Sequence, residues 1–266
     1  MTEQNDPRFA TTLARGLSVL RAFRVTDEGL SNAEIAQRTG LPKSTVSRLT
    51  FTLGELGYLV QSPRDDRFRP GPTLVAVGHV AASSLSFLVP AHDLMQRLAE
   101  ESGTLVVLAV RDGDKMVLIR TWRPTRVASI WLEVGQRIPL QPFSSWRAFI
   151  VAATPAEIER IAAEHLPDPD ALDALLVDRP QALADMALQG FVSTPAGSGM
   201  SAAYNAVSVP FRSSNLAEPV VFTCGALPAE APIKRMETDV GPRLAAAIRT
   251  LERLTGQAPG LVRMEA

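Results

Sequence analysis

The hydrophobic positions of residues 31–59, SNAEIAQRTGLPKSTVSRLTFTLGELGYL, follow two helical stripes that meet across the turn TGLP. In the second stripe the apolar residues recur at i, i+3, i+7 and i+10, on one face of a helix: Val46, Leu49, Leu53 and Leu56. The opposite face carries small hydroxyls and cations: Lys43, Ser44, Thr45, Ser47, Arg48 and Thr50. The first stripe starts with the capping-box spacing of Ser31 and Glu34 and ends at Gly40, which can adopt the left-handed conformation. Two short helices joined by a tight turn are typical of a helix-turn-helix.

Flanking patterns extend this pair to three helices and a hairpin. A preceding helix is predicted by the apolar residues Leu13, Leu17, Leu20 and Phe23. After the pair, short strands at Tyr58–Gln61 and Phe68–Arg69 flank a turn at residues 63–66. Three helices followed by a basic hairpin predict a winged helix-turn-helix, whose recognition helix enters the major groove of DNA. We therefore expect DNA contacts from Lys43, Ser44, Thr45, Ser47 and Arg48 on the helix and from Arg64, Arg67 and Arg69 on the wing.

The polar face of the second helix also has a plainer interpretation, the solvated side of an ordinary amphipathic helix. Small hydroxyls and cations near a helix start reach phosphates and base edges without steric bulk, and the helix N-terminus attracts phosphate. The basic hairpin beside it favours the DNA interpretation. A protein-interaction module, in which the winged fold docks another protein, is a further hypothesis.

The hydrophobic period changes from helical to alternating after Thr104. Before that point, helices are predicted over residues 72–88 and 90–101. Two strand-like runs surround the turn Asp112-Gly113-Asp114, and RVASIWLEV at residues 126–134 predicts a third strand. Further strands are predicted at GFVSTP, YNAVSVPF and PVVFTCGAL, and helices at 144–153, 155–165, 170–176, 179–189 and 233–254. Strands and helices in this mixed order favour an α+β domain on an antiparallel sheet.

Composition narrows the class of protein. The chain has 266 residues, 46% of them hydrophobic, which is enough for two domains. Residues 1–70 carry 10 Lys and Arg against 8 Asp and Glu, a net charge of +2, so a basic face must come from local clustering. The single cysteine, Cys224, excludes an internal disulfide. Because signal-peptide and membrane-span patterns are missing, we expect a soluble cytoplasmic protein with no membrane partner.

Catalytic and metal-binding motifs are missing from the sequence. His79, His92 and His165 have no zinc-site spacing, and no P-loop, G-x-S-x-G or G-x-G-x-x-G motif occurs. Cys224 lies in a predicted strand and is interpreted as a small buried residue. We expect no cofactor, no metal and no enzyme. The alternative, a small-molecule enzyme with a helical interaction domain, would need a reactive dyad that the sequence does not show.

Several motifs together resemble the IclR-type bacterial transcription regulators. LARGLSVLRAF, the helix pair with its ELGYL exit, and RFRPGPTLVAVG occur in order between Thr12 and Gly78. GDKMVLIRT, LEVGQRIPL and YNAVSVPF…PVVFTCGAL extend the resemblance more loosely. It implies a winged helix-turn-helix at residues 1–71, a linker helix at 72–89 and a GAF-like effector-binding domain at 90–266. It also implies a double-stranded operator, a small organic effector, and a homodimer or homotetramer acting as repressor or activator.

In this family the effector cavity is walled by the turn after a G-x-R-x-P motif and by the late strands. The sequence departs from the usual family residues, mostly toward apolar side chains, at Gln141, Phe143, Trp146, Gly199, Ala206, Phe222 and Cys224. We therefore predict an aromatic or mostly apolar effector rather than a two- or three-carbon acid. The resemblance places it against Phe143, Trp146, Ala206, Phe222 and Cys224, with polar handles from Ser144, Ser145, Asn205, Ser208 and Arg126. Alternatively, the aromatic residues fill the cavity and the regulator does not respond to an effector.

Overall fold

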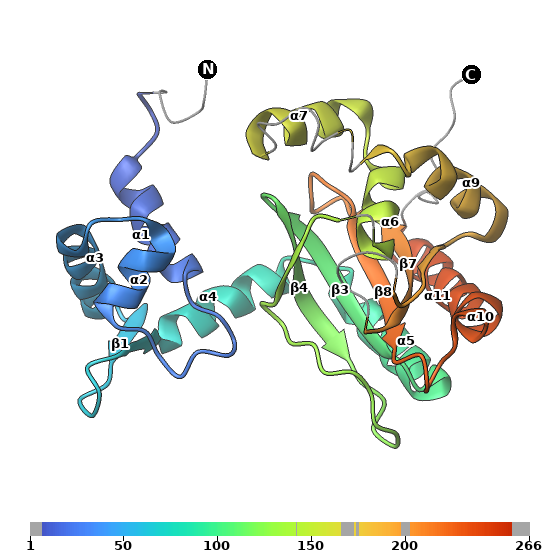
Figure 1. Cartoon of the computed structure of the whole chain (residues 1–266), viewed down its shortest axis with the longest axis horizontal. Coiled ribbons are helices and arrows are strands. Elements are labelled where there is room, and N and C mark those ends of the chain that lie inside the picture. The colour runs from blue at the N-terminus through green and yellow to red at the C-terminus, as the bar shows by residue number, and fades with distance from the viewer. Residues whose placement is uncertain (1–6, 142, 166–172, 174–175, 198–202, 257–266) are drawn as a thin grey trace. The chain divides into compact units, whose positions relative to one another are not determined.

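A computed structural model describes residues 7–141, 143–165, 173, 176–197 and 203–256. The chain forms two compact units, Met1–Ser84 and Leu85–Ala266. Figure 1 shows the elements of each unit. No single helix in the described ranges is long and apolar enough to cross a membrane; the helices Pro72–Ser83 and Leu88–Ser102 satisfy that test only when counted together.

The N-terminal unit is the predicted winged helix-turn-helix. Its elements are α1 Thr11–Arg21, α2 Asn32–Thr39, α3 Lys43–Glu55, β1 Leu59–Gln61, β2 Phe68–Pro70 and α4 Pro72–Ser83. The capping box at α2 is confirmed, because the Ser31 Oγ accepts from the Glu34 N–H at 3.3 Å and Glu34 accepts from the Ser31 N–H at 2.8 Å. Gly40 ends α2 with φ 70°. The antiparallel pair β1 and β2 forms the wing.

A small apolar core holds α3 against the other two helices. Its buried residues are Val19, Leu30, Ile35, Ala36, Val46, Leu59 and Phe68. Two predictions about α3 are wrong. Thr50 is fully buried, because it lies four residues after Val46 on the same face, and its hydroxyl donates to Asn32 Oδ1 at 2.9 Å. Leu56 follows the last turn of α3 and is 60% exposed.

The C-terminal unit is built on one antiparallel sheet with strand order β5-β4-β3-β8-β7-β6. Its strands are β3 Leu105–Asp112, β4 Lys115–Trp122, β5 Arg137–Pro139, β6 Val192–Thr194, β7 Asn205–Phe211 and β8 Val220–Ala226. Its helices are α5 Leu88–Ser102, α6 Ser144–Ala152, α7 Pro155–His165, α9 Arg179–Gln189, α10 Ile233–Arg235 and α11 Gly241–Leu254, with a π-helical turn at Met236–Val240. In Figure 1, α6 covers one face of the sheet, and α5 and α11 cover the other.

One predicted strand is absent. Residues 126–134 form neither helix nor strand, and the strand β5 begins only at Arg137. The alternating apolar residues Ile130 and Leu132 of this segment contact the interior of the unit without pairing to a neighbouring strand. The helix predicted at 170–176 falls mostly outside the described residues.

Candidate DNA-binding surface and effector cavity

The outward surface of α3 presents the residues expected to read DNA. Thr45 is half-buried, and four of them are exposed: Lys43, Ser44, Ser47 and Arg48. In the part of the chain that the structure describes, Lys43 and Arg48 make no side-chain ion pair. Val46, on the opposite side, is fully buried and holds the helix to the core. Because no side chain caps the start of α3 after Pro42, its first N–H groups add a favourable field for phosphate.

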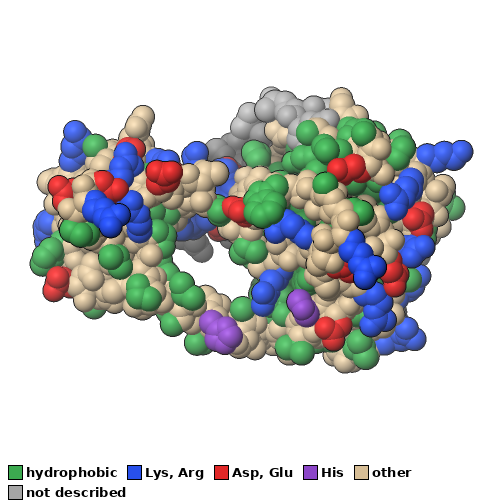
Figure 2. Space-filling model, turned by 90° about the horizontal axis from the view of Figure 1, so that it is seen from below, with side chains coloured by type: hydrophobic (Ala, Val, Ile, Leu, Met, Phe, Trp, Pro, Cys, Tyr) green, Lys and Arg blue, Asp and Glu red, His purple; other side chains and the backbone are tan. Residues whose placement is uncertain are grey.

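The wing carries both paired and unpaired arginines. Arg64, at the exposed turn, makes no side-chain ion pair among the described residues. Arg69 instead pairs with Asp65 at 2.8 Å. The hydrogen bond from this guanidinium holds the pKa of Asp65 below its ordinary value. Figure 2 shows basic and acidic side chains next to each other on the surface of the N-terminal unit.

Arg67 is directed toward the body of the unit. Its Nη1 donates to the Gly29 carbonyl at 2.6 Å and lies 3.1 Å from the Glu34 carboxylate. Hydrogen bonds from Ser31, and then from Arg67, hold the pKa of Glu34 below its ordinary value. The guanidinium therefore joins the wing to the start of α2. The expected contact of Arg67 with DNA stays a prediction, and the structure adds an internal contact to it.

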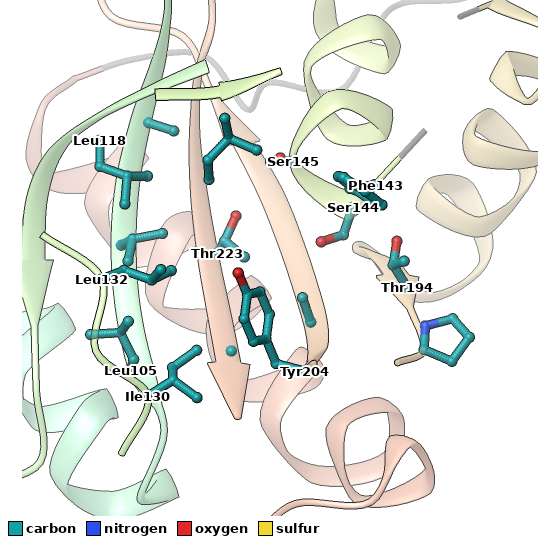
Figure 3. Close-up of a pocket in the computed structure, with 16 residues that line it drawn as sticks. Leu105, Leu118, Ile130, Leu132, Phe143, Ser144, Ser145, Thr194, Tyr204 and Thr223 are labelled. Atoms are coloured by element: carbon teal, nitrogen blue, oxygen red, sulfur yellow. The ribbon is translucent and has the colours of Figure 1, made fainter. Parts of the chain in front are cut away.

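A cavity of about 70 Å³ lies between α6 and the sheet of the C-terminal unit (Figure 3). Aliphatic side chains form much of its wall: Leu105, Val107, Ala109, Leu118, Ile130, Leu132 and Ile138. Hydroxyls come from Ser144, Ser145, Thr194, Tyr204 and Thr223. None of the described lining residues carries a charge. Figure 3 shows the aliphatic side chains of the β3 and β4 side facing the hydroxyls of α6 and β6.

Three of the hydroxyls in this region form a hydrogen-bonded chain. The Ser208 Oγ donates to the Ser144 Oγ at 2.9 Å and lies 2.7 Å from the Thr223 Oγ1. Ser208 is fully buried and Ser144 is 1% exposed. A further hydroxyl, that of Thr194, is only 8% exposed, and its Oγ1 has no hydrogen-bond partner within the described structure.

The residues expected to bind an effector are divided between the cavity and its surroundings. Those that line it are Phe143, Ser144, Ser145 and Ala206. Ser208 lies behind the wall and reaches the cavity through its two hydroxyl partners. Asn205 is occupied elsewhere, because its Nδ2 donates to the Ala231 carbonyl and its Oδ1 accepts from the Ala196 N–H, both at 2.8 Å. Arg126 is exposed and does not line the cavity.

Phe222 and Cys224 do not line the cavity, because side chains alternate along β8. Thr223 and Gly225 take the cavity side of that strand. Phe222 stacks on Trp122 with ring centroids 6.1 Å apart, on the side that α5 covers. Burial raises the pKa of the Cys224 thiol to about 12, so this thiol is protonated at neutral pH.

Trp146 also lies outside the cavity wall. Its ring stacks on Phe149 with centroids 5.4 Å apart, in the core beneath α6. Two of the aromatic residues considered as cavity fillers, Trp146 and Phe222, therefore fill other space.

Three residues that line the cavity were not predicted from the sequence: Thr194, Tyr204 and Thr223. No group of three His, Cys, Asp or Glu side chains in the described ranges could hold a metal ion.

A winged helix-turn-helix followed by a second, separate domain is typical of a DNA-binding regulator. The model of the IclR helix-turn-helix domain matches residues 12–63, and that of the bacterial transcriptional regulator IclR C-terminal domain matches residues 79–169. The chain belongs to the IclR family of DNA-binding transcriptional regulators.

Relatives agree with this assignment. An IclR family transcriptional regulator from Brucella abortus, known from a crystal structure, is 32% identical, with 96% of each chain covered and a TM-score of 0.74. The HTH-type transcriptional regulator TsaQ1/TsaQ2 of Comamonas testosteroni is 28% identical over 91% of this chain and 87% of its own length. An IclR homolog from Microbacterium hydrocarbonoxydans, solved with 4-hydroxybenzoate, shares the fold at 22% identity and a TM-score of 0.65, over 90% of this chain and 99% of its own. The relatives from Brucella abortus and Comamonas testosteroni are transcriptional regulators, which sets the enzyme hypothesis aside.

Proposed function

We propose that this regulator binds a palindromic operator as a homodimer in the cytoplasm and responds to a small, mostly apolar effector in the C-terminal cavity. The observation that carries the DNA-binding part is the exposed surface of α3. Ser44, Thr45, Ser47 and Arg48 read base edges and phosphates of the major groove, and Lys43 adds charge at the helix start. Arg64 contacts the phosphate backbone from the wing, while Arg67 and Arg69 act through their internal ion pairs.

Substitution of Arg48 and Arg64 separates base reading from charge attraction. Arg48→Ala should weaken binding to the operator by roughly 1–3 kcal/mol while changing binding to random DNA much less. Arg64→Ala should weaken binding to both DNAs and reduce the salt slope of log K by about one. Fluorescence anisotropy with the operator and a scrambled duplex measures both. Arg97→Ala, an exposed arginine on α5, is the control. Equal loss on both duplexes with Arg48→Ala would contradict a base-reading role.

An apolar effector is supported by the wall of the cavity. Burial of apolar ligand surface contributes about 25 cal/mol per Å², and the wall is largely aliphatic with hydroxyls at one side. The homolog from Microbacterium hydrocarbonoxydans binds an aromatic molecule, 4-hydroxybenzoate, in its crystal. The volume of about 70 Å³ is smaller than the roughly 150 Å³ of a cavity that holds benzene. An aromatic effector therefore requires part of the wall to move. The same small volume favours, as the second candidate, a regulator without an effector.

A homodimer is supported by the surface of α4. This helix is apolar around its circumference, yet none of its residues is buried within the chain. Its exposed residues include Val75, Val77 and Val80, and Figure 2 shows hydrophobic side chains at its surface. A helix of this kind is normally covered by a partner. A two-fold dimer would also match the symmetry of a palindromic operator.

A further inference from the structure

The three-hydroxyl chain at the cavity has a fixed count of protons. Ser208 has one hydroxyl proton and donates it to Ser144. The contact of 2.7 Å between Ser208 and Thr223 must therefore be donated by Thr223. The Ser144 proton is left over and is available to a ligand. The Thr223 oxygen, whose proton is already used, offers only lone pairs to the cavity. The chain thus presents one donor, Ser144, and one acceptor, Thr223.

We infer that the cavity selects an uncharged effector with a hydroxyl group, an alcohol or a phenol, over the corresponding carboxylate. This inference rests on the proposed effector response. A ligand hydroxyl both accepts and donates, so it satisfies Ser144 and Thr223 together. A carboxylate only accepts. For Ser144 and Thr223 both to donate to a carboxylate, one of the two hydrogen bonds within the three-hydroxyl chain would have to break. Buried Ser208 has no other described partner that could replace the lost hydrogen bond.

The charge balance of the wall acts in the same direction. No Lys, Arg or His is among the described residues that line the cavity. A carboxylate in an aliphatic enclosure would lose its hydration without gaining a counter-ion. The N-terminus of α6, which begins at Ser144, offers a partial positive charge in compensation. An alcohol loses far less hydration and needs no such compensation.

Thr194 adds a second, independent sign of a hydrogen-bonding ligand. Its Oγ1 is buried in the wall without a partner in the described structure. A buried hydroxyl without a partner is unfavourable, and a ligand that supplies one relieves that cost. The polar side chains of the described cavity wall are therefore all hydroxyls.

Matched pairs of probes test the selectivity on the full chain. We would measure dissociation constants by calorimetry at pH 7.5 for 2-methylpropan-1-ol against isobutyrate, and for benzyl alcohol against benzoate. The first pair is small, and the second includes an aromatic ring. In each pair that binds, the alcohol should bind about tenfold more tightly or better, the equivalent of one buried hydrogen bond. A carboxylate that binds as tightly as its alcohol, or failure of all four probes, would overturn the inference.

Removal of the middle hydroxyl tests the mechanism of selection. In Ser208→Ala the Thr223 proton is released toward the cavity in addition to the Ser144 proton, so the preference for alcohol should fall at least fivefold. Ser102→Ala, which removes another fully buried serine hydroxyl outside the cavity, should leave the preference unchanged. If Ser208→Ala does not fold, Thr223→Val takes its place. This variant removes the acceptor and should also reduce the preference for alcohol. A folded variant at either position with the wild-type preference would refute the proton count.

The same preparations should be assayed for binding to operator DNA. Retained operator binding with no alcohol preference would reject this inference and leave the DNA-binding regulator intact. Loss of DNA binding by the wild-type chain would instead reject the proposed function.

Discussion

At the scale of single residues, two arginines on one wing have different surroundings. Arg64 is exposed and makes no ion pair among the described residues, whereas Arg67 contacts the Gly29 carbonyl and the Glu34 carboxylate. Glu34 also completes the capping box of α2 with Ser31. Arg67 therefore connects the wing to the element that precedes the recognition helix. Its effect on DNA binding would arise through the position of the wing.

This arrangement predicts that Arg67→Ala and Glu34→Gln both weaken DNA binding. A simple charge model predicts that the two substitutions change DNA affinity in opposite directions, because Glu34→Gln removes a negative charge and should strengthen attraction to phosphate. Since either substitution removes the side-chain ion pair between the wing and α2, we expect a loss of severalfold in affinity for both. The double variant should lose little more than Arg67→Ala alone.

Operator affinity measured over a range of salt concentrations distinguishes positioning from direct contact. For Arg64→Ala the salt slope should fall, and for Glu34→Gln it should stay at the wild-type value while affinity decreases. If Glu34→Gln binds DNA more tightly than the wild type, the positioning role of Arg67 is wrong.

At the scale of elements, residues 123–135 form a wall of the cavity that belongs to no helix or strand. The Arg123 guanidinium stacks on the Trp131 ring at 4.1 Å and donates to the Leu132 carbonyl. The segment is joined to α5 by Glu100, whose carboxylate accepts from the Thr125 N–H at 3.1 Å. This hydrogen bond holds the pKa of Glu100 below its ordinary value. A wall held by side chains can move without breaking the sheet.

Ile130 of this segment lines the cavity, and we expect its side chain to limit the size of the cavity. It is 8% exposed and packs on the sheet where Gly225 leaves room, since a Cβ there would lie 3.0 Å from the Ile130 Cδ1. Ile130→Ala should lower the free energy of unfolding by about 2–4 kcal/mol and enlarge the cavity. Toluene should then raise the melting temperature of the variant by several degrees more than that of the wild type.

Ile248→Ala, at a buried position on α11 away from the cavity, is the matched control. It should lose comparable stability without gaining a response to toluene. Equal stabilisation of all three proteins by toluene would show that Ile130 does not limit the cavity.

The success of sequence reasoning also differs between kinds of element. The helix pair was predictable, because a capping box, a left-handed glycine and a 3.6-residue stripe are local signals. The side of β8 that faces the cavity was not predictable, because period-two alternation does not say which face of a strand meets α6. A shift of one residue exchanges Phe222 for Thr223. Register supplies the missing information, since Ala206, on the cavity wall, lies opposite Gly225. The segment 126–134 alternates like a strand because Ile130 and Leu132 face the interior, whereas Trp131 between them is 71% exposed.

At the scale of the whole molecule, the DNA-binding unit exposes apolar residues that its own core does not need. Leu13 and Leu17, which belong to the apolar stripe that predicted α1, are 63% and 51% exposed. Val75 and Val80 of α4 are 75% and 70% exposed. The core of this unit is complete without them. Such a surface is stable in water when a second copy of the chain covers it.

We therefore predict that a double substitution, Val75→Asp with Val80→Asp, converts the regulator from a dimer to a monomer. The two substitutions would place four carboxylates at a self-complementary dimer interface, where they would lose hydration without partners. Sedimentation equilibrium should show a shift of at least tenfold in the dimer dissociation constant. Because each monomer keeps its own α3, binding to an isolated half-site should remain, while binding to the full palindrome should lose its cooperative advantage. Val177→Asp, at an equally exposed valine of the C-terminal unit, should leave both properties unchanged. If the double variant remains a dimer with full affinity for the palindrome, then α4 is not the contact between copies, and the exposed valines must serve another purpose.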